Sequence, residues 1–205
     1  MRTITDITPQ VKSASRCNIF LDGEFFCGMS LETVMKNRLK VGSRVDERTL
    51  ERIQLESEMH TAIDKAMTYL SGSVKSEKQV RDYLKEKGFT LPVVNEACEK
   101  LNEYGFLNDG YYAQRYVESY ATKKGVRLIR TELRRKGLKE EDVDEAISEL
   151  GDQSDAALAI AEKYMRGKEP DMKNVQKLYR HLLSKGFTYD DAKSAVDRIK
   201  QDEEY

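Results

Sequence analysis

Three stretches of the chain align without a gap and decide its fold: VRDYLKEKGF at residues 80–89, IRTELRRKGL at 129–138 and LYRHLLSKGF at 178–187. Their glycines lie 49 residues apart in both intervals (137 − 88 and 186 − 137). Apolar positions recur in the same register beyond each glycine. A period in the range of about 20–50 residues with one repeated apolar pattern is typical of tandem helical units.

Each copy carries signals for three helices. A glycine closes the middle helix, because glycine readily adopts the left-handed conformation of a helix C-terminus. Ser76 and Gln79 form a capping-box pattern at the start of the first middle helix, and Pro170-Asp171 open the third. Capping or acidic groups start the third helices, at Thr90 with Pro92, Glu140–Asp142 and Thr188 with Asp191. We expect the first helices at Asp46–Leu70, Asp109–Lys123 and Ser154–Arg166.

The N-terminal segment has a different pattern. Asp22-Gly23 separates two apolar runs, which predicts a type I′ β-hairpin with strands at about 16–21 and 24–29. The predicted pairing sets Asn18 opposite Cys27. Residues 3–5 are a candidate third strand, and a short helix is expected at Leu31–Lys40.

The sequence thus predicts an all-α fold, a tandem array of three three-helix repeats with a small N-terminal β-hairpin extension. The expected boundaries are residues 1–45 for the extension, 46–108 for the first repeat, 109–152 for the second and 153–205 for the third.

Composition excludes several classes of protein. The chain has 35 Lys and Arg against 36 Asp and Glu, and 39% hydrophobic residues, so it should fold rather than remain disordered. It has no apolar run long enough for a membrane span and no signal-peptide pattern at its start, so we expect a cytoplasmic protein with no membrane partner. Cys17, Cys27 and Cys98 should be free thiols.

Catalytic and metal-binding patterns are absent from the sequence. His60 and His181 are isolated within predicted helices, and the cysteines lack metal-ligand spacing. We therefore expect no metal, no cofactor and no enzymatic activity. The Asp and Glu pairs already have a structural use at helix starts.

Charge is distributed unevenly in the second repeat. Residues 115–139 contain nine basic and two acidic residues, whereas residues 140–155 contain eight acids and no base. Arg127, Arg130 and Arg134 form a helical stripe that cannot also face the core. The candidate binding residues are Arg115, Lys123, Lys124, Arg127, Arg130, Arg134, Arg135 and Lys136.

Two interpretations of this basic surface stay open. It binds phosphates or carboxylates of a partner, because guanidinium forks suit both. Alternatively, it is a solvated face neutralised by the acidic helix that follows. Tyr112, Tyr116 and Tyr120 share one helix face; we expect the first two to pack in the core and leave Tyr120 as a candidate for stacking on bases.

The second repeat also carries a family signature. YGFLND at residues 104–109, followed by Tyr112-Ala113, Tyr116-Val117, Gly125, Ile129, Leu133 and Lys136-Gly137, closely resembles the central signature of the RecX family of bacterial recombination regulators. The resemblance covers about residues 62–199. The hairpin segment looks like a variable N-terminal extension outside the family's shared core.

The resemblance implies a partner. RecX-like proteins act on the RecA recombinase filament on single-stranded DNA and reduce its recombinase, ATPase and coprotease activities. An asymmetric array with a distinct N-terminal cap is compatible with a monomer, and the pI of about 6.2 predicts that any contact with single-stranded DNA is weak or indirect. The basic surface would then meet either DNA phosphates or an acidic patch on RecA.

The alternative from another class is a stand-alone helical nucleic-acid-binding or scaffold module. A DNA-binding domain usually shows an overall basic excess, and the pI of about 6.2 argues mildly against this alternative.

Overall fold

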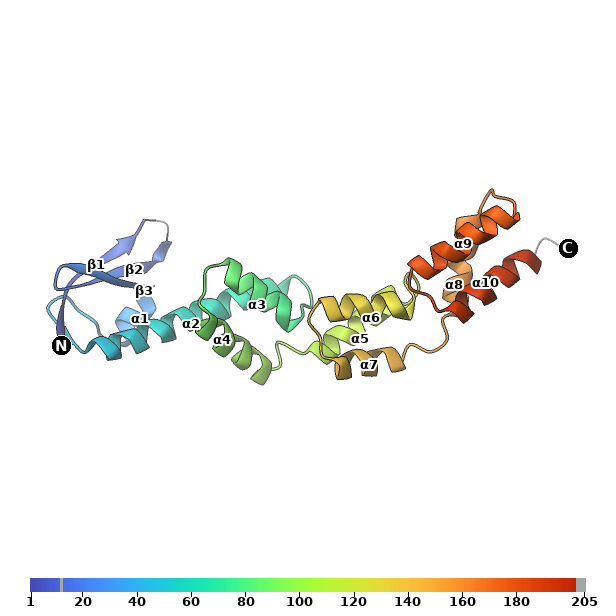
Figure 1. The fold of residues 1–205 in the computed structure, drawn as a ribbon. Coiled ribbons are helices and arrows are strands. Elements are labelled where there is room, and N and C mark those ends of the chain that lie inside the picture. Colours follow the sequence, from blue (N-terminus) through green and yellow to red (C-terminus); the bar gives the residue numbers. More distant parts are fainter. Residues whose placement is uncertain (12, 202–205) are drawn as a thin grey trace. The chain divides into compact units, whose positions relative to one another are not determined.

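The computed structural model describes residues 1–11 and 13–201 (Figure 1). The contacts among its residues divide the chain into two compact units. The first unit contains Met1–Val74 and Gln79–Leu107. The second contains Lys75–Lys78 and the chain from Asn108 onward. None of the helices in the described residues is long and apolar enough to span a membrane.

The first unit begins with a four-stranded antiparallel sheet in the order β3-β2-β1-β4. Its strands are β1 (Arg2–Gln10), β2 (Ser13–Leu21), β3 (Glu24–Ser30) and β4 (Arg44–Val45). Asp22 and Gly23 have φ angles of 50° and 88°, which confirms the type I′ turn. The candidate third strand at residues 3–5 is confirmed as part of β1. The fold is not strictly all-α, because β1 and β4 extend the hairpin into a four-stranded sheet.

Two further expectations for this segment are wrong. Asn18 lies opposite Gly28, and Cys27 lies opposite Ile19, because a bulge adds one residue to β3 after Phe25. Helix α1 (Leu31–Lys36) ends before the predicted Lys40, since the chain turns at Arg38 with a φ of 52°.

Alternating side chains of the sheet build its core. Ile19 and Leu21 of β2 are fully buried, and they belong to one apolar cluster with Leu50 and Ile53 of α2 (Glu47–Ser71). Packing against a helix supplies the stability that an isolated hairpin lacks. Cys17, Cys27 and Cys98 are buried, and none of them forms a disulfide bond within the described residues.

Within residues 1–11 and 13–201, nine helices follow the sheet in three groups, each with its own apolar cluster. The first group is α2 with α3 (Glu77–Glu86) and α4 (Leu91–Glu103). The second is α5 (Asp109–Tyr120), α6 (Val126–Arg135) and α7 (Glu140–Ser148). The third is α8 (Ser154–Met165), α9 (Met172–Ser184) and α10 (Tyr189–Gln201). The described residues thus agree with a helical repeat architecture.

The middle helices end as the repeat predicts. Gly88, Gly137 and Gly186 have φ angles of 86°, 88° and 86°. The N–H of the residue after each glycine bonds back to the helix; Phe187, for example, donates to the Leu182 carbonyl at 3.3 Å.

Other helix ends refine the predictions. Thr188 and Asp191 cap α10 reciprocally, as predicted. Helix α5 is shorter than predicted and ends at Tyr120 instead of Lys123. The residues between Tyr120 and α6 form the connection on which the second and third repeats meet.

Candidate functional site

The start of α6 is joined to the end of α9 by backbone hydrogen bonds. Gly125 donates its N–H to the Lys185 carbonyl at 2.9 Å, and Arg127 donates to the Gly186 carbonyl at 3.0 Å. The first N–H groups of a helix and its last carbonyls have no partner inside the helix. Each helix end therefore satisfies the other, and α6 needs no side-chain cap at Gly125.

Gln153 completes this junction between the second and third repeats. Its side chain is buried and accepts a hydrogen bond from the Val126 N–H at 2.7 Å. The same amide donates to the Ala121 and Lys124 carbonyls at 3.0 and 3.1 Å. One side chain thus fixes both ends of the connection that carries Lys123 and Lys124.

The three tyrosines of α5 form a ladder along one helix face. Ring centroids of Tyr112 and Tyr116 are 6.1 Å apart, and those of Tyr116 and Tyr120 are 4.5 Å apart. Tyr112 is buried, whereas Tyr116 and Tyr120 are half-buried. The Lys124 ammonium lies 4.0 Å from the Tyr120 ring centroid. Tyr120 therefore already packs against a tilted ring and contacts a cation.

Glu132 of α6 binds both a cation and a tyrosine hydroxyl beside this ladder. Its carboxylate accepts from Lys124 Nζ at 2.6 Å and from the Tyr116 hydroxyl at 2.6 Å. Burial alone would raise the pKa of Glu132, but the hydrogen bonds from Lys124 and Tyr116 outweigh it and lower that pKa. Burial and the bond to Glu132 raise the pKa of Tyr116. The Lys136 ammonium lies over the Tyr116 ring, 5.5 Å from its centroid.

The arginine stripe of α6 is partly neutralised by α7. Arg130 Nη1 lies 2.6 Å from a Glu140 oxygen and also pairs with Asp144. Arg134 binds Glu140 through two nitrogens, at 2.8 and 2.6 Å. The hydrogen bond from Arg134 is the main reason that the pKa of Glu140 is lowered. These contacts match the solvated-face interpretation for two of the three stripe arginines.

The remaining candidates differ in what they contact. Arg115 pairs with Glu118 within α5. Arg127 lies over the Tyr189 ring, 4.7 Å from its centroid. Among the residues that the structure describes, no ion pair holds Lys123, Arg127 or Arg135, and all three are exposed.

Sequence reasoning named Lys124 as a binding candidate but missed the contacts that hold this surface together. Lys124 and Glu132 are eight residues apart and separated by Gly125, so no helical spacing links them. Gln153 gives no sequence signal beyond its position before α8. The sequence gives no sign that the Lys185 carbonyl accepts the junction bond from Gly125.

Comparison with known families matches each part of the chain. The matching descriptions are "Regulatory protein RecX N-terminal domain" at residues 2–46 and the first, second and third three-helix domains of RecX at 62–101, 108–147 and 152–196. The N-terminal segment, which the resemblance placed outside the shared core, is thus a domain of the family in its own right.

Individual relatives agree with this assignment. The chain is 34% identical to "Regulatory protein RecX" of Clostridium perfringens strain 13 over 99% of both chains. It is 33% identical to the Bacillus subtilis protein of the same name over 98% of this chain and 78% of that one. A crystal structure of regulatory protein RecX superimposes with a TM-score of 0.69 and 28% identity, over 96% of this chain and 100% of that chain. The chain therefore belongs to the RecX family of regulatory proteins.

Proposed function

We propose that this chain binds the RecA recombinase assembled on single-stranded DNA and inhibits its strand-exchange, ATPase and coprotease activities. The observation that carries the proposal is the match of all four RecX domains along one chain, with 34% identity to a named regulatory protein over 99% of both sequences. The protein would act as a cytoplasmic monomer through binding rather than chemistry.

The second repeat supplies the proposed contact surface. Lys123, Arg127 and Arg135 are exposed, and no described carboxylate pairs with them. Arg130 and Arg134 are already bound by Glu140, so they would contribute only after exchanging partners. The cations without acidic partners are therefore the first candidates for contact with DNA phosphates or acidic residues of RecA.

The test is RecA's hydrolysis of ATP on single-stranded DNA, titrated with the purified protein at ratios well below one per RecA. Loss of hydrolysis at such ratios is the expected result, because a protein that limits filament growth acts on many RecA subunits at once. No loss at any ratio, with folded protein and the host's own RecA, would overturn the proposal.

A charge-reversal variant tests the surface. Arg127→Glu with Arg135→Glu should weaken inhibition about tenfold or more, because contacts to phosphate or carboxylate become repulsive. Arg48→Glu with Arg52→Glu is the matched control, since both side chains are exposed on α2 and carry the same change of charge. Equal inhibition by the two variants would show that Arg127 and Arg135 do not contribute to the proposed contact surface.

Measuring the affinity for DNA without RecA distinguishes a RecA regulator from a stand-alone nucleic-acid-binding module. Under the proposal, affinity for single-stranded DNA alone is weak and falls steeply with salt. Tight binding without RecA, combined with no effect on ATP hydrolysis, would favour a stand-alone nucleic-acid-binding protein.

A further inference from the structure

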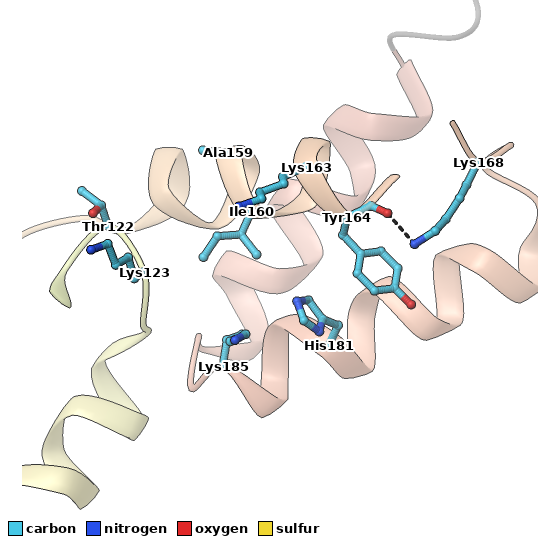
Figure 2. A pocket seen from close by; sticks show the side chains of 9 residues that line it. All are labelled: Thr122, Lys123, Ala159, Ile160, Lys163, Tyr164, Lys168, His181 and Lys185. Carbon is cyan, nitrogen blue, oxygen red and sulfur yellow. Dashed lines mark hydrogen bonds between the residues drawn. The ribbon is translucent and has the colours of Figure 1, made fainter. Parts of the chain in front are cut away.

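A cleft of about 680 Å³ lies in the second unit, outside the surface described above except for Lys123. Its walls come from the α5–α6 connection, helix α8, the α8–α9 connection and the end of α9 (Figure 2). A volume of this size is typical of sites for small organic ligands and greatly exceeds that of one phosphate ion. The lining residues are Thr122, Lys123, Ala159, Ile160, Lys163, Tyr164, Lys168, His181 and Lys185.

The lining is strongly cationic. It includes four lysines from four segments, and no carboxylate is among the lining residues that the structure describes. Lys123, Lys163 and Lys185 form no ion pair in the described part of the chain. Like charges gathered in one cleft repel each other and focus a positive potential on the space between them. The cleft is therefore complementary to an anion with more than one negative charge.

One end of the cleft is aromatic. The rings of Tyr164 and His181 stack with their centroids 4.7 Å apart, and Lys168 covers Tyr164 with its ammonium 3.6 Å from the ring centroid. Lys168 also donates to the Tyr164 carbonyl at 2.5 Å. Ala159 and Ile160 add an apolar wall beside these rings. The cleft thus combines cations with an apolar surface suited to a flat ring.

The walls are held in place by the repeat junction. The Lys185 carbonyl accepts from Gly125, two residues after Lys123. Gln153 binds the carbonyls on either side of Thr122 and Lys123. Because these bonds fix the backbone of two walls, the cleft exists before any ligand arrives, which reduces the entropy cost of binding.

We propose that this cleft binds a nucleotide, with its phosphates on the lysines and its base against the apolar wall. Two sources share this chemistry: a free nucleoside polyphosphate, and a nucleotide of a single strand. The proposal does not require RecA, so it stands or falls separately from the proposed function.

His181 provides a direct readout of the cleft. Burial lowers the pKa of its imidazole, and the nearby charges of Lys185 and Lys168 lower it further. The groups that face it are Tyr164 of α8, Lys168 of the α8–α9 connection and Lys185 of α9. A bound phosphate would offset these positive charges and raise the pKa of His181.

The experiment follows the two histidine ring signals by NMR while ATP, pyrophosphate or a short oligothymidylate is added to the full chain. We expect the His181 signal to shift and its pKa to rise, while the signal of His60, in the first unit, stays unchanged. A response to ATP alone identifies a free nucleotide, and a response to the oligonucleotide alone identifies a strand. No His181 response to ATP or to the oligonucleotide would overturn the proposal.

A charge-reversal pair tests the lysines. Lys163→Glu with Lys185→Glu should weaken binding about tenfold or more. Lys193→Glu with Lys200→Glu is the matched control, since both side chains are exposed on α10 and neither lines the cleft. Equal affinity of the two variants would overturn the proposal. If a variant does not fold, the response of the His181 NMR signal in the unmodified chain still tests whether the cleft binds a nucleotide.

Discussion

Gly125 donates its backbone N–H to the carbonyl oxygen of Lys185 at 2.9 Å, although the two residues belong to different repeats. A Cβ atom at Gly125 would lie 2.1 Å from the Phe187 nitrogen. Only glycine can therefore occupy this position without a clash. The hydrogen bond places the start of α6 directly against the end of α9, and it positions the segment that carries Lys123.

Replacing Gly125 with alanine should destabilise the second unit. The added methyl group meets backbone rather than a flexible side chain, so the junction must open, at a cost of about 3 kcal/mol. Urea unfolding measures the change. Gly110→Ala is the control, because its Cβ would meet only ordinary contacts at 3.4 and 3.5 Å. That change should be neutral or stabilising by up to about 1 kcal/mol. Similar losses in both variants would contradict the close fit at Gly125.

Gln153→Ala should cost about 2–3 kcal/mol of unfolding free energy. The substitution removes three hydrogen bonds and leaves the Val126 N–H and two carbonyls without their partner. Gln176→Ala, on the exposed face of α9, should change stability by less than about 0.5 kcal/mol. Thermal unfolding of both variants checks this, and an unaffected Gln153→Ala would show that water replaces the side chain.

Glu140→Ala should strengthen binding to RecA filaments. The carboxylate binds both Arg130 and Arg134, and its removal frees the Arg134 guanidinium for a partner and leaves Arg130 paired only with Asp144. We expect inhibition of ATP hydrolysis at lower protein ratios and little change in stability, because exposed ion pairs contribute little. Glu141→Ala makes the same charge change in the same helix turn as a control. Equal effects of both variants would mean that net charge alone matters.

Acid should destabilise the second unit partly through Glu132. The pKa of its carboxyl is lowered in the folded chain, so its contribution is complete above the unfolded pKa of about 4.3. The contribution is lost as pH falls through the folded pKa. Glu132→Gln should therefore be less stable at neutral pH and lose less stability on acidification. Urea unfolding at several pH values measures both, with the exposed Glu145→Gln as control. If the unfolding free energy of Glu132→Gln falls with acid as steeply as that of the unmodified chain, Glu132 does not contribute to the acid sensitivity.

The helical part of the fold could be predicted because its signals are local. Gly88, Gly137 and Gly186 mark the helix ends, and all three adopt the left-handed conformation that the pattern requires. The sheet could be predicted only in part. The turn at Asp22-Gly23 has a local signature, but β4 is two residues long and pairs with β1 from more than 40 positions away. Such pairing leaves no pattern in a single sequence.

The proposed binding surface was less predictable than the fold. The sequence identified the basic stripe of α6, and it left open whether acids of the next helix neutralise it. The contacts of Arg130 and Arg134 with Glu140 depend on the angle between α6 and α7, which the stripe itself does not encode. The cleft around His181 gave no signal, because its lysines come from four separate segments.

The backbone bonds between α6 and α9 also bear on cooperativity. In most repeat proteins, neighbouring units interact through side chains, and each interface adds a separate nearest-neighbour term to the stability. Here the second and third repeats also share main-chain hydrogen bonds. If α9 unfolds, the N–H groups at the start of α6 therefore lose their acceptors. The second and third repeats are thereby coupled energetically, and a local opening in either one spreads to the other.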